Sequence, residues 1–510
     1  MIKRRHSIFV FLFLLWAFAS AADEGSGLTL MEWSTARDTV PLSMTMYSAA
    51  TAVLNKKNSK YVSKKNQMHK KPNILFILVD DLGWKDINAY EKQDIDTPAL
   101  DKLAREGMLF THAYASAPVC SPSRAAALTG QYPARIGLTN HLSHHNYTPK
   151  DALWADAPSL SSLPSNALTF AEVLQKQGYR TGFFGKWHLS TSVKGAAAKG
   201  AADPSTSPDK QGFDRALGGG MYGGPPSWFS PYRNAYIRDG EPGEYLPERL
   251  ASEVIQFISE DNSKPFIAVM WPFLVHSPLD TKKHLIEKYE KRKSQGRKIG
   301  KSPILAGMIE ALDLAIAEVL QVLAERDLSD NTLVIFSSDN GGTVHSNNGG
   351  LRGTKGYLFE GGLRVPLIVR WPGEIAPGSV SDALVSNVDF FPTFLAAAGV
   401  DLSPYADNLD GVNLLPLLRG EAASRSGPIY FHYPNYAWHQ KNRLGGAIIE
   451  GHYKLINWYD DDSVALYNLE RDPGETTDLS QKEKALAARL TIQFRAWLKR
   501  LDAKMPIKQH

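Results

Sequence analysis

Cys120 is the only cysteine in the 510 residues, so it cannot form a disulfide within the chain. It opens the stretch CSPSRAAALTG, in which Pro122 is typical of the first turn of a helix and Arg124 follows one turn on. Free backbone N–H groups at a helix start favour an anion, and with a nearby arginine they lower the pKa of a thiol. The alternative is a buried structural cysteine, which would not need proline and arginine at these positions. The pattern therefore predicts that Cys120 is a functional group.

Two pairs of oxygen-bearing side chains each follow a continuous apolar run. Asp80 and Asp81 come directly after NILFILV, and Asp339 and Asn340 come directly after TLVIFSS. Adjacent carboxylates repel each other unless a cation lies close to both. Either pair alone could be a solvated turn, but together they offer hard oxygen ligands, which suit Ca²⁺ or Mg²⁺ and not zinc. The sequence therefore predicts one divalent cation site.

Further cations and histidines occur in three separate segments. Lys186 and His188 lie in GFFGKWHL and would point to the same side of an extended segment. His276 follows the apolar run PFIAVMW, and Lys355 lies in the glycine-rich stretch LRGTKGYLFEGG. Each of these residues alone could be structural. Together with Arg124 they could neutralise the oxygens of a transferred sulfuryl or phosphoryl group and deliver a proton to the leaving oxygen.

The elements that must position these groups are alternating strands and helices. Runs that are apolar throughout predict strands buried on both faces at 73–79, 265–271, 332–338 and 365–371. Between them, Thr169 and Glu172 form the capping box of a predicted helix, and residues 308–323 place their apolar side chains on one face. We therefore expect an α/β fold with a large mixed, mostly parallel sheet flanked by helices. The polar clusters would lie at the carboxyl ends of its strands.

The pattern changes after about Gly427. Short strand candidates separated by turn residues follow, in PIYFHYP, GAIIEG, YKLINW and VALYNL, and residues 486–501 form an amphipathic helical pattern. This predicts a smaller C-terminal α+β subdomain containing an antiparallel sheet. The expected boundaries are 72–426 for the catalytic domain and 427–510 for the C-terminal subdomain.

The N-terminal residues combine basic side chains, a short apolar run and small side chains between Lys3 and Ala22. This order predicts a cleaved signal peptide at 1–21, because a bilayer crossing takes about 20 apolar residues. An uncleaved anchor is the alternative. Residues 22–71 form a basic N-terminal extension that ends in a lysine-rich linker, for which attraction to an anionic polymer or surface is the functional alternative. We expect a secreted or periplasmic protein without stable membrane insertion after signal cleavage.

The overall composition narrows the function classes. The chain is 22% charged and 43% hydrophobic, which is typical of globular proteins. Its formal net charge is +4 at pH 7, although three of the basic residues fall in the predicted signal peptide. A body this close to neutral gives no reason to expect nucleic-acid binding, which requires a basic face.

The segment from Cys120 to Gly130 resembles the signature of the type I, formylglycine-dependent sulfatases, which belong to the alkaline-phosphatase-like superfamily. The other polar clusters match that family in order and approximate spacing, and residues 465–480 resemble its C-terminal signature. The resemblance covers the chain from about Pro72 to its end. One departure is Ala127, where the family more often has leucine, and it should affect helix packing and not chemistry.

The resemblance implies a specific chemistry. A maturation enzyme would oxidise Cys120 to formylglycine, and the aldehyde would hydrate to a geminal diol. One hydroxyl of the diol would attack sulfur and expel the alcohol. The second hydroxyl would then lose its proton, so that the aldehyde reforms and sulfate leaves. One Ca²⁺ ion would be held by Asp80, Asp81, Asp339 and Asn340, with the modified residue 120 also bound to it. The resemblance implies that Arg124 orients the formylglycine and that Lys186 and Lys355 neutralise the sulfate oxygens. His276, with Lys355, would protonate the leaving oxygen. His188 would take the proton whose loss releases sulfate, and Asp339 would help to deprotonate the attacking hydroxyl.

Other functions remain open for the same residues. The first alternative is a formylglycine-dependent phosphodiesterase or phosphonate hydrolase, although related two-metal phosphatases often have Asp-His where this chain has Asp339 and Asn340. The second is a non-catalytic binder of sulfated glycans. Three segments mix aromatic and basic side chains, which would suit a sulfated carbohydrate as the partner, although ordinary loop packing is the alternative for each: 140–147, 222–236 and 431–443.

Overall fold

A nine-stranded sheet forms the centre of the computed structural model, which describes residues 71–142, 146–191, 202–260 and 263–509. The predicted signal peptide lies outside the described residues, and so does the basic extension up to residue 70. Of the helices in the described ranges, none combines the length and the apolar character that a bilayer crossing requires.

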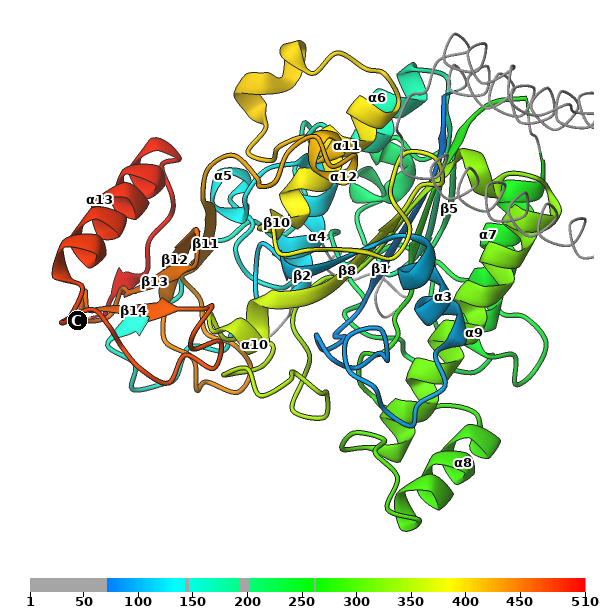
Figure 1. Cartoon of the computed structure of the whole chain (residues 1–510), viewed down its shortest axis with the longest axis horizontal. Coiled ribbons are helices and arrows are strands. Elements are labelled where there is room, and N and C mark those ends of the chain that lie inside the picture. The colour runs from blue at the N-terminus through cyan, green and yellow to red at the C-terminus, as the bar shows by residue number, and fades with distance from the viewer. Residues whose placement is uncertain (1–70, 143–145, 192–201, 261–262, 510) are drawn as a thin grey trace, which may run out of the picture. The chain divides into compact units, whose positions relative to one another are not determined.

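Most strands of this sheet run parallel to one another (Figure 1). In the order in which they neighbour each other, the strands are β10 (Val385–Ser386), β2 (Met108–Tyr114), β8 (Arg364–Arg370), β7 (Thr332–Ser338), β1 (Asn73–Val79), β6 (Phe266–Trp271), β4 (Arg180–Gly185) and β5 (Arg215–Leu217), with β9 (Ser379–Ser381) beside β2. β8 is antiparallel to both β7 and β2. The structure thus confirms the predicted mixed, mostly parallel sheet.

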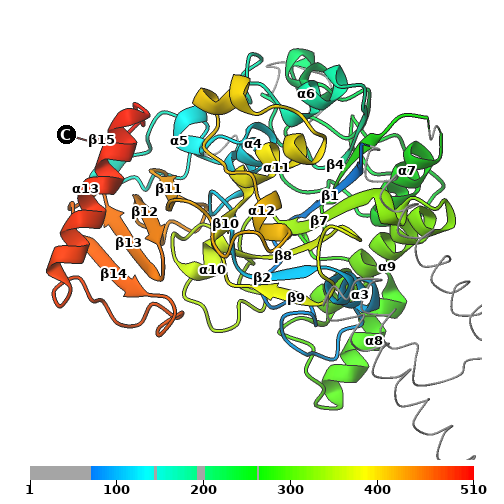
Figure 2. The ribbon, with the colours of Figure 1, turned by 45° about the horizontal axis from the view of Figure 1, so that its top comes forward.

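The central strand β1 is apolar throughout because helices cover both faces of the sheet. Ile74 and Phe76 pack into one core, which includes α4 (Cys120–Thr129), α6 (Phe170–Lys176) and α11 (Phe390–Ala397). Leu75 and Ile77 pack into the other core, with α3 (Pro98–Glu106), α7 (Leu246–Glu260) and α9 (Pro303–Glu325). The two groups of helices lie on opposite sides of the sheet in Figure 2. A strand covered in this way cannot alternate polar and apolar residues.

The predicted helices form where their caps place them. Thr169 and Glu172 make the expected capping box at the start of α6, with reciprocal bonds of 3.2 and 2.8 Å. α9 begins at Pro303, five residues before the predicted helix, because Ser302 caps it by accepting a hydrogen bond from the Leu305 amide. Both helices place their apolar faces in the cores described above.

The C-terminal residues form a second, antiparallel sheet, as predicted. Its strands are β11 (Ile429–Tyr433), β12 (Gly445–Glu450), β13 (Tyr453–Trp458) and β14 (Val464–Asn468), in that order. Helix α13 (Lys484–Arg500) lies across one face, where Phe494 and Trp497 join the core that contains Leu455 (Figure 2). This amphipathic helix corresponds to the pattern at 486–501.

The opposite face of the second sheet supports the loops around the large sheet. Phe431 and Ile456 share a core with Val119, Leu358 and Leu363. Val119 directly precedes the cysteine-bearing helix α4. Leu358 lies two residues before the short helix α10 (Glu360–Leu363), and Leu363 is the last residue of that helix. The C-terminal sheet therefore packs against the loops that carry two of the predicted site segments.

Candidate active site

The carboxyl ends of four neighbouring parallel strands meet at one edge of the large sheet. β7, β1, β6 and β4 are consecutive in the sheet and point the same way. The segments after these strands carry, in that order, Asp339 with Asn340, Asp80 with Asp81, His276, and Lys186 with His188. Sequence segments that are far apart thus converge at one place, as expected for an open α/β sheet.

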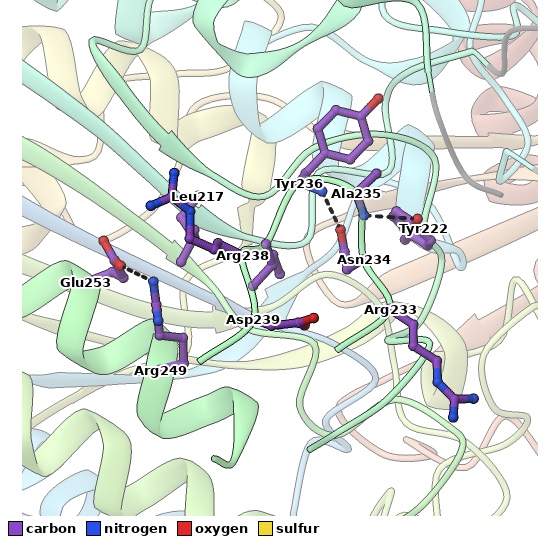
Figure 3. A pocket seen from close by; sticks show the side chains of 11 residues that line it. Leu217, Tyr222, Arg233, Asn234, Ala235, Tyr236, Arg238, Asp239, Arg249 and Glu253 are labelled. Atoms are coloured by element: carbon purple, nitrogen blue, oxygen red, sulfur yellow. Dashed lines mark hydrogen bonds and ion pairs between the residues drawn. The ribbon is translucent and has the colours of Figure 1, made fainter. Parts of the chain in front are cut away.

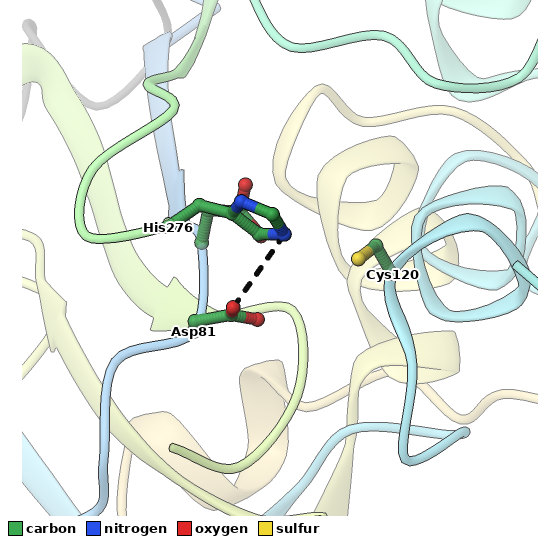
Figure 4. Close-up of side chains that lie close together, drawn as sticks. Asp81, Cys120 and His276 are labelled. Carbon is green, nitrogen blue, oxygen red and sulfur yellow. Dashed lines mark ion pairs between the residues drawn. The ribbon is translucent and has the colours of Figure 1, made fainter. Parts of the chain in front are cut away.

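Cys120 faces this edge from the start of helix α4. It is the first residue of the helix, with Val119 as the N-cap and a left-handed Gly130 at the other end. The side chain is buried, and Figure 4 shows its sulfur directed toward His276 and Asp81. One ligand atom from each of Asp80, Asp81, Cys120 and His276 lies within 4.8 Å of the others. The predicted nucleophile position and the predicted cation site are therefore a single site.

Asp80 and Asp339 are held by buried cations. Lys186 Nζ lies 2.7 Å from Asp80 Oδ2. Arg124 reaches Asp339 Oδ2 with both Nε and Nη2 at 2.8 Å, and its Nη1 donates to the carbonyl oxygen of Lys186 at 2.9 Å. The Arg124 side chain is fully buried. Arg124 therefore ties the segments after β7 and β4 to helix α4.

Asp81 is the second point of convergence. Its Oδ1 forms an ion pair with Lys355 Nζ at 2.6 Å and accepts a hydrogen bond from Asn340 Nδ2 at 2.8 Å. Its Oδ2 lies 3.7 Å from His276 Nε2. Asp81 has a left-handed backbone with φ of 63°, a conformation that costs energy for a non-glycine residue. This strain is typical of functional sites, where the surroundings fix a side chain in an unusual direction.

Three oxygens of this site lack hydrogen-bond donors among the described residues: Asp80 Oδ1, Asp81 Oδ2 and Asn340 Oδ1. Each belongs to a fully buried side chain. Buried polar atoms without partners are costly and need an explanation such as an ion. Carboxylate and amide oxygens are the ligands that Ca²⁺ prefers, so the donor set fits that ion. Asp339 is not among the four clustered residues: its Oδ2 is bonded to Arg124, and its Oδ1 accepts the Asp81 backbone amide at 3.3 Å.

The pKa values of the two adjacent carboxyls also reflect this crowding. Burial raises the pKa of Asp80 to about 8, against the opposing attraction of Lys186. Burial would also raise the pKa of Asp81, but Lys355 and His276 outweigh it and hold that pKa below its usual value. The neighbouring cations therefore favour the ionised form of Asp81, whereas the ionised form of Asp80 would be favoured by an added cation beside it.

Three further groups are shifted in directions that suit chemistry. Burial would raise the pKa of the Cys120 thiol, but the ammonium groups of Lys186 and Lys355 hold it well below its usual value. Burial lowers the pKa of His188. Burial would lower the pKa of His276 as well, but the carboxylates of Asp80 and Asp81 raise it above its usual value.

Hydrogen bonds assign the two histidines different free nitrogens. His188 Nε2 lies 2.8 Å from the Leu142 carbonyl oxygen and must donate to it, so Nδ1 carries the lone pair. That Nδ1 is buried without a hydrogen-bond donor in the part of the chain described. His276 Nδ1 donates to the Ser277 carbonyl oxygen at 2.6 Å, so its Nε2 is the nitrogen that faces Asp81. His188 adopts a left-handed backbone with φ of 55°, so the segment is not the regular extended one that the sequence suggested.

Parts of all three aromatic and basic segments border this site. Gly223 and Gly224 lie so close that an added Cβ would be 3.3 Å from His188 Nε2 and 2.8 Å from His276 Nδ1. His439 Nε2 lies 3.4 Å from the carbonyl oxygen of Lys355. Leu142, in the first segment, accepts the bond from His188, while residues 143–145 lie outside the described residues.

A separate pocket of about 770 Å³ is lined in part by the second segment, including Tyr222, Arg233 and Tyr236. Its wall includes Leu217 at the end of β5 and Arg249 and Glu253 of α7. Figure 3 shows Arg233 and Arg238 extending in different directions, while Arg249 points to Glu253. The cations of this pocket do not converge on one point, unlike those around Cys120.

The structure brings every residue that the sequence marked for the site to the same edge of the sheet, although Asp339 is not among the four clustered residues. What sequence reasoning missed are the backbone groups and close approaches: the Leu142 carbonyl oxygen and the two glycines beside the histidines. It also did not single out Trp438, whose ring centroid lies 5.5 Å from Lys355 Nζ. The aromatic content of 431–443 was the available signal, but it does not distinguish this ring from its neighbours.

Comparison with known protein families gives two matches. Residues 72–400 match the family model described as Sulfatase. Residues 353–504 match the model described as N-sulphoglucosamine sulphohydrolase, C-terminal. The first match covers the large sheet and the residues around Cys120, and the second covers Lys355 and the antiparallel sheet.

Individual proteins agree with these matches. The chain is 31% identical over 518 residues to steryl-sulfatase from Mus musculus, covering 80% of this chain and 78% of that protein. It is 34% identical over 393 residues to N-acetylgalactosamine-6-sulfatase from Homo sapiens, covering 71% of this chain and 68% of that protein. The crystal structure of Ps i-CgsB in complex with k-i-k-neocarrahexaose superposes with a TM-score of 0.70 at 28% identity, covering 84% of this chain and 93% of that one.

Proposed function

This chain belongs to the sulfatase family, and we propose that it removes sulfate from a sulfated polysaccharide or its oligosaccharides outside the cytoplasm. The relatives make it a sulfuric ester hydrolase of the alkaline-phosphatase-like fold. The saccharide substrate is supported by a relative named for N-acetylgalactosamine 6-sulfate and by a neighbour that holds a neocarrahexaose. Export is supported by the basic and apolar N-terminal sequence.

We further propose that residues 72–426 carry the catalytic groups and that 427–510 support them. The observation that carries the functional proposal is the set of buried oxygens of Asp80, Asp81 and Asn340 that have no hydrogen-bond donor among the described residues. Burying oxygens without hydrogen-bond donors is costly, and a bound cation would offset that cost. Asn340, where two-metal phosphatases often have histidine, supports one cation and sulfate rather than two metals and phosphate.

In this proposal, Asp80, Asp81, Asp339 and Asn340 hold one Ca²⁺ ion together with residue 120. When bound, the ion supplies a fixed positive charge close to the sulfate oxygens. Lys186 and Lys355 add further positive charge from buried positions. Each ammonium group is held in place by a carboxylate of the site, Lys186 by Asp80 at 2.7 Å and Lys355 by Asp81 at 2.6 Å. Groups fixed in this way stabilise developing charge without having to reorganise.

We propose that a maturation enzyme converts Cys120 to formylglycine. Once hydrated, that group supplies the hydroxyl that attacks sulfur. The support from this chain is that the thiol is buried at the start of α4, directed into the site, and has no second cysteine to pair with. Arg124, one turn further along α4, orients this part of the helix through its bonds to Asp339.

The two histidines take opposite parts in proton transfer. His188 presents a lone pair on Nδ1 because Nε2 donates to Leu142, so it can accept a proton from residue 120. His276 keeps Nδ1–H bonded to Ser277, so its Nε2 can hold a proton and pass it to the leaving alcohol oxygen near Lys355. Groups in environments that push their pKa values apart commonly divide into acid and base in this way.

The proposal is tested by mass spectrometry of the peptide that contains residue 120, from protein made in its native host. An aldehyde in place of the thiol, together with sulfate release from sulfated saccharides, is the expected result. An unmodified thiol in fully active enzyme would contradict the formylglycine proposal. Faster turnover of a nitrophenyl phosphodiester than of any sulfate ester would favour the phosphodiesterase alternative.

A further inference from the structure

The side chain of Trp438 occupies an unusual position beside the catalytic lysine. Its ring centroid lies 5.5 Å from Lys355 Nζ, and that ammonium group is 2.6 Å from Asp81. Lys355 is only 4% exposed, whereas Trp438 is 43% exposed. The exposed indole therefore lies next to the buried ammonium group of Lys355, which binds the sulfate group in the proposed function.

The exposed indole is held in place by neighbouring rings. The His141 ring meets the indole edge to face, with ring centroids 5.9 Å apart, and stacks on Tyr147 with centroids 5.2 Å apart. The His439 ring also meets the indole, with centroids 5.2 Å apart, and stacks on Tyr357 with centroids 4.6 Å apart. We call these five rings the ring belt. Three distant segments contribute to it, so the indole is fixed although nearly half of it is exposed to solvent.

A large apolar surface fixed beside a buried polar site is typical of ligand contact. Pockets for small molecules combine aromatic walls with a few polar groups that set orientation. A flat indole face can cover one face of a ring and exclude water from it, while the ammonium group nearby binds the ring's sulfate.

The polar atoms of the ring belt favour a sugar over a steroid. His141 Nδ1 lies 3.1 Å from Asn140 Oδ1, which also accepts the His141 amide at 2.9 Å, so Nδ1 donates and Nε2 carries a lone pair. Burial lowers the pKa of His141 to about 3, which keeps the imidazole neutral. A neutral acceptor beside an aromatic face suits a ring hydroxyl. An aliphatic steroid skeleton would leave that acceptor unsatisfied.

We propose that Trp438 is the stacking surface for the sugar ring that carries the sulfate ester, and that His141 Nε2 accepts a hydrogen bond from a hydroxyl of that ring. This inference rests on the proposed function, because it takes Lys355 as a sulfate-binding group. It makes Trp438 and His141 specificity-determining residues, outside the proton-transfer steps. The sulfate group itself would be bound equally well without them.

Binding separates this proposal from the proposed function. In Cys120→Ala protein, calorimetry with N-acetylgalactosamine 6-sulfate and with k-i-k-neocarrahexaose measures affinity without turnover. Adding Trp438→Ala should weaken the better-bound saccharide by about 10- to 100-fold, the effect expected for uncovering one aromatic face. Trp438→Phe should weaken it only a few-fold, and His141→Phe by about 5- to 10-fold. Affinity for inorganic sulfate should stay unchanged in all three.

The control is a substitution on helix α13, outside the ring belt. Ile492→Ala removes a side chain on α13 that is 70% exposed, and it should change neither affinity. If Trp438→Ala leaves saccharide binding within about two-fold, or weakens inorganic sulfate equally, Trp438 is not a stacking surface. If only a steroid sulfate binds and depends on Trp438, the sugar assignment is wrong. If protein with residue 120 unsubstituted releases no sulfate from a saccharide whose binding shows this contrast, the result would instead count against the catalytic proposal.

Discussion

The Nε2 atom of His188 lies 2.8 Å from the Leu142 carbonyl oxygen, which fixes the imidazole with its Nδ1 lone pair turned into the site. This relationship joins a side chain after β4 to a backbone group in the loop that follows α4 and α5 (Pro133–Ile136). Without the Leu142 carbonyl oxygen, nothing in this bond would determine which nitrogen of His188 carries the proton and which carries the lone pair. The proposed role of His188 as a base depends on this tautomer.

His188→Ala should separate the two halves of the reaction. Loss of a general base lowers rates by about 10²–10⁴-fold, and here the loss should fall on sulfate release. Rapid-quench measurements should show the alcohol product appearing in the first turnover and sulfate lagging behind it. His345→Ala, at an exposed histidine in the loop after β7, is the control and should leave both rates unchanged. If alcohol and sulfate appear together at the normal rate, His188 is not the base.

His276→Ala should instead affect the departure of the alcohol. Sugar alcohols are poor leaving groups and need a proton, whereas nitrophenolate leaves without one. The variant should therefore lose about 10²–10⁴-fold in kcat on a sulfated saccharide and much less on nitrophenyl sulfate. Saccharide affinity should be retained. Equal losses on both substrates would contradict the role of His276 as the general acid.

The strand-end carboxylates were predictable because their signal is local. Asp80 and Asp339 each follow a run that is apolar throughout, and such runs mark buried parallel strands. Strand β4, which directly precedes Lys186, was not predicted because RTGFFG is short and contains two glycines, which weaken a strand pattern. The antiparallel direction of β8 could not be read either, since burial on both faces looks alike in either direction.

Contacts between distant segments could not be predicted from the sequence. The His188 to Leu142 bond involves a backbone oxygen, and any residue type could supply it. Likewise, the aromatic segments 140–147 and 431–443 were visible as compositions, but only folding places His141 against Trp438. Side-chain chemistry was therefore predictable, and the geometry that selects one nitrogen or one ring was not.

Calcium should stabilise the folded protein through the oxygens of Asp80, Asp81 and Asn340 that have no hydrogen-bond donor in the described part of the chain. A ligand at 100 times its Kd adds about 2.7 kcal/mol to the free energy of unfolding, so Ca²⁺ should raise Tm and a chelator should reverse the rise. Asp80→Asn should abolish this shift, because it removes one of the charges facing the ion. Asp86→Asn is the matched control, since Asp86 is also buried but its carboxylate accepts backbone amides of Gly83 and Asn347. A calcium shift that persists in Asp80→Asn would place the ion elsewhere.

A buried ionic cluster links the C-terminal sheet to the loop that follows Lys355. Lys454 Nζ on β13 lies 3.0 Å from Glu360 Oε1 and 2.9 Å from Glu475 Oε1, and all three side chains are fully buried. Two carboxylates thus share one ammonium group, and the Glu360 carboxylate also lies 3.7 Å from Arg364 Nη1. Burial raises the pKa of Glu475 from 4.5 to about 7, with Lys454 opposing that shift and Glu360 adding to it.

Glu475→Gln should therefore change stability in a pH-dependent way. Below pH 4.5 the Glu475 carboxyl is protonated in both the folded and the unfolded chain. Titration of this group should therefore cause little difference in stability between the variant and the native protein. Between pH 4.5 and about 7 the folded state holds a proton that the unfolded state has lost, so native stability falls as pH rises. The glutamine variant lacks this titration, and its Tm relative to native protein should increase across that window and level off above it. Gln493→Glu, which adds a carboxyl on α13 near Glu450 outside the cluster, should not reproduce this profile. A Tm difference between Glu475→Gln and native protein that stays constant from pH 4.5 to 8 would show that Glu475 is ionised throughout and that Lys454 neutralises both carboxylates.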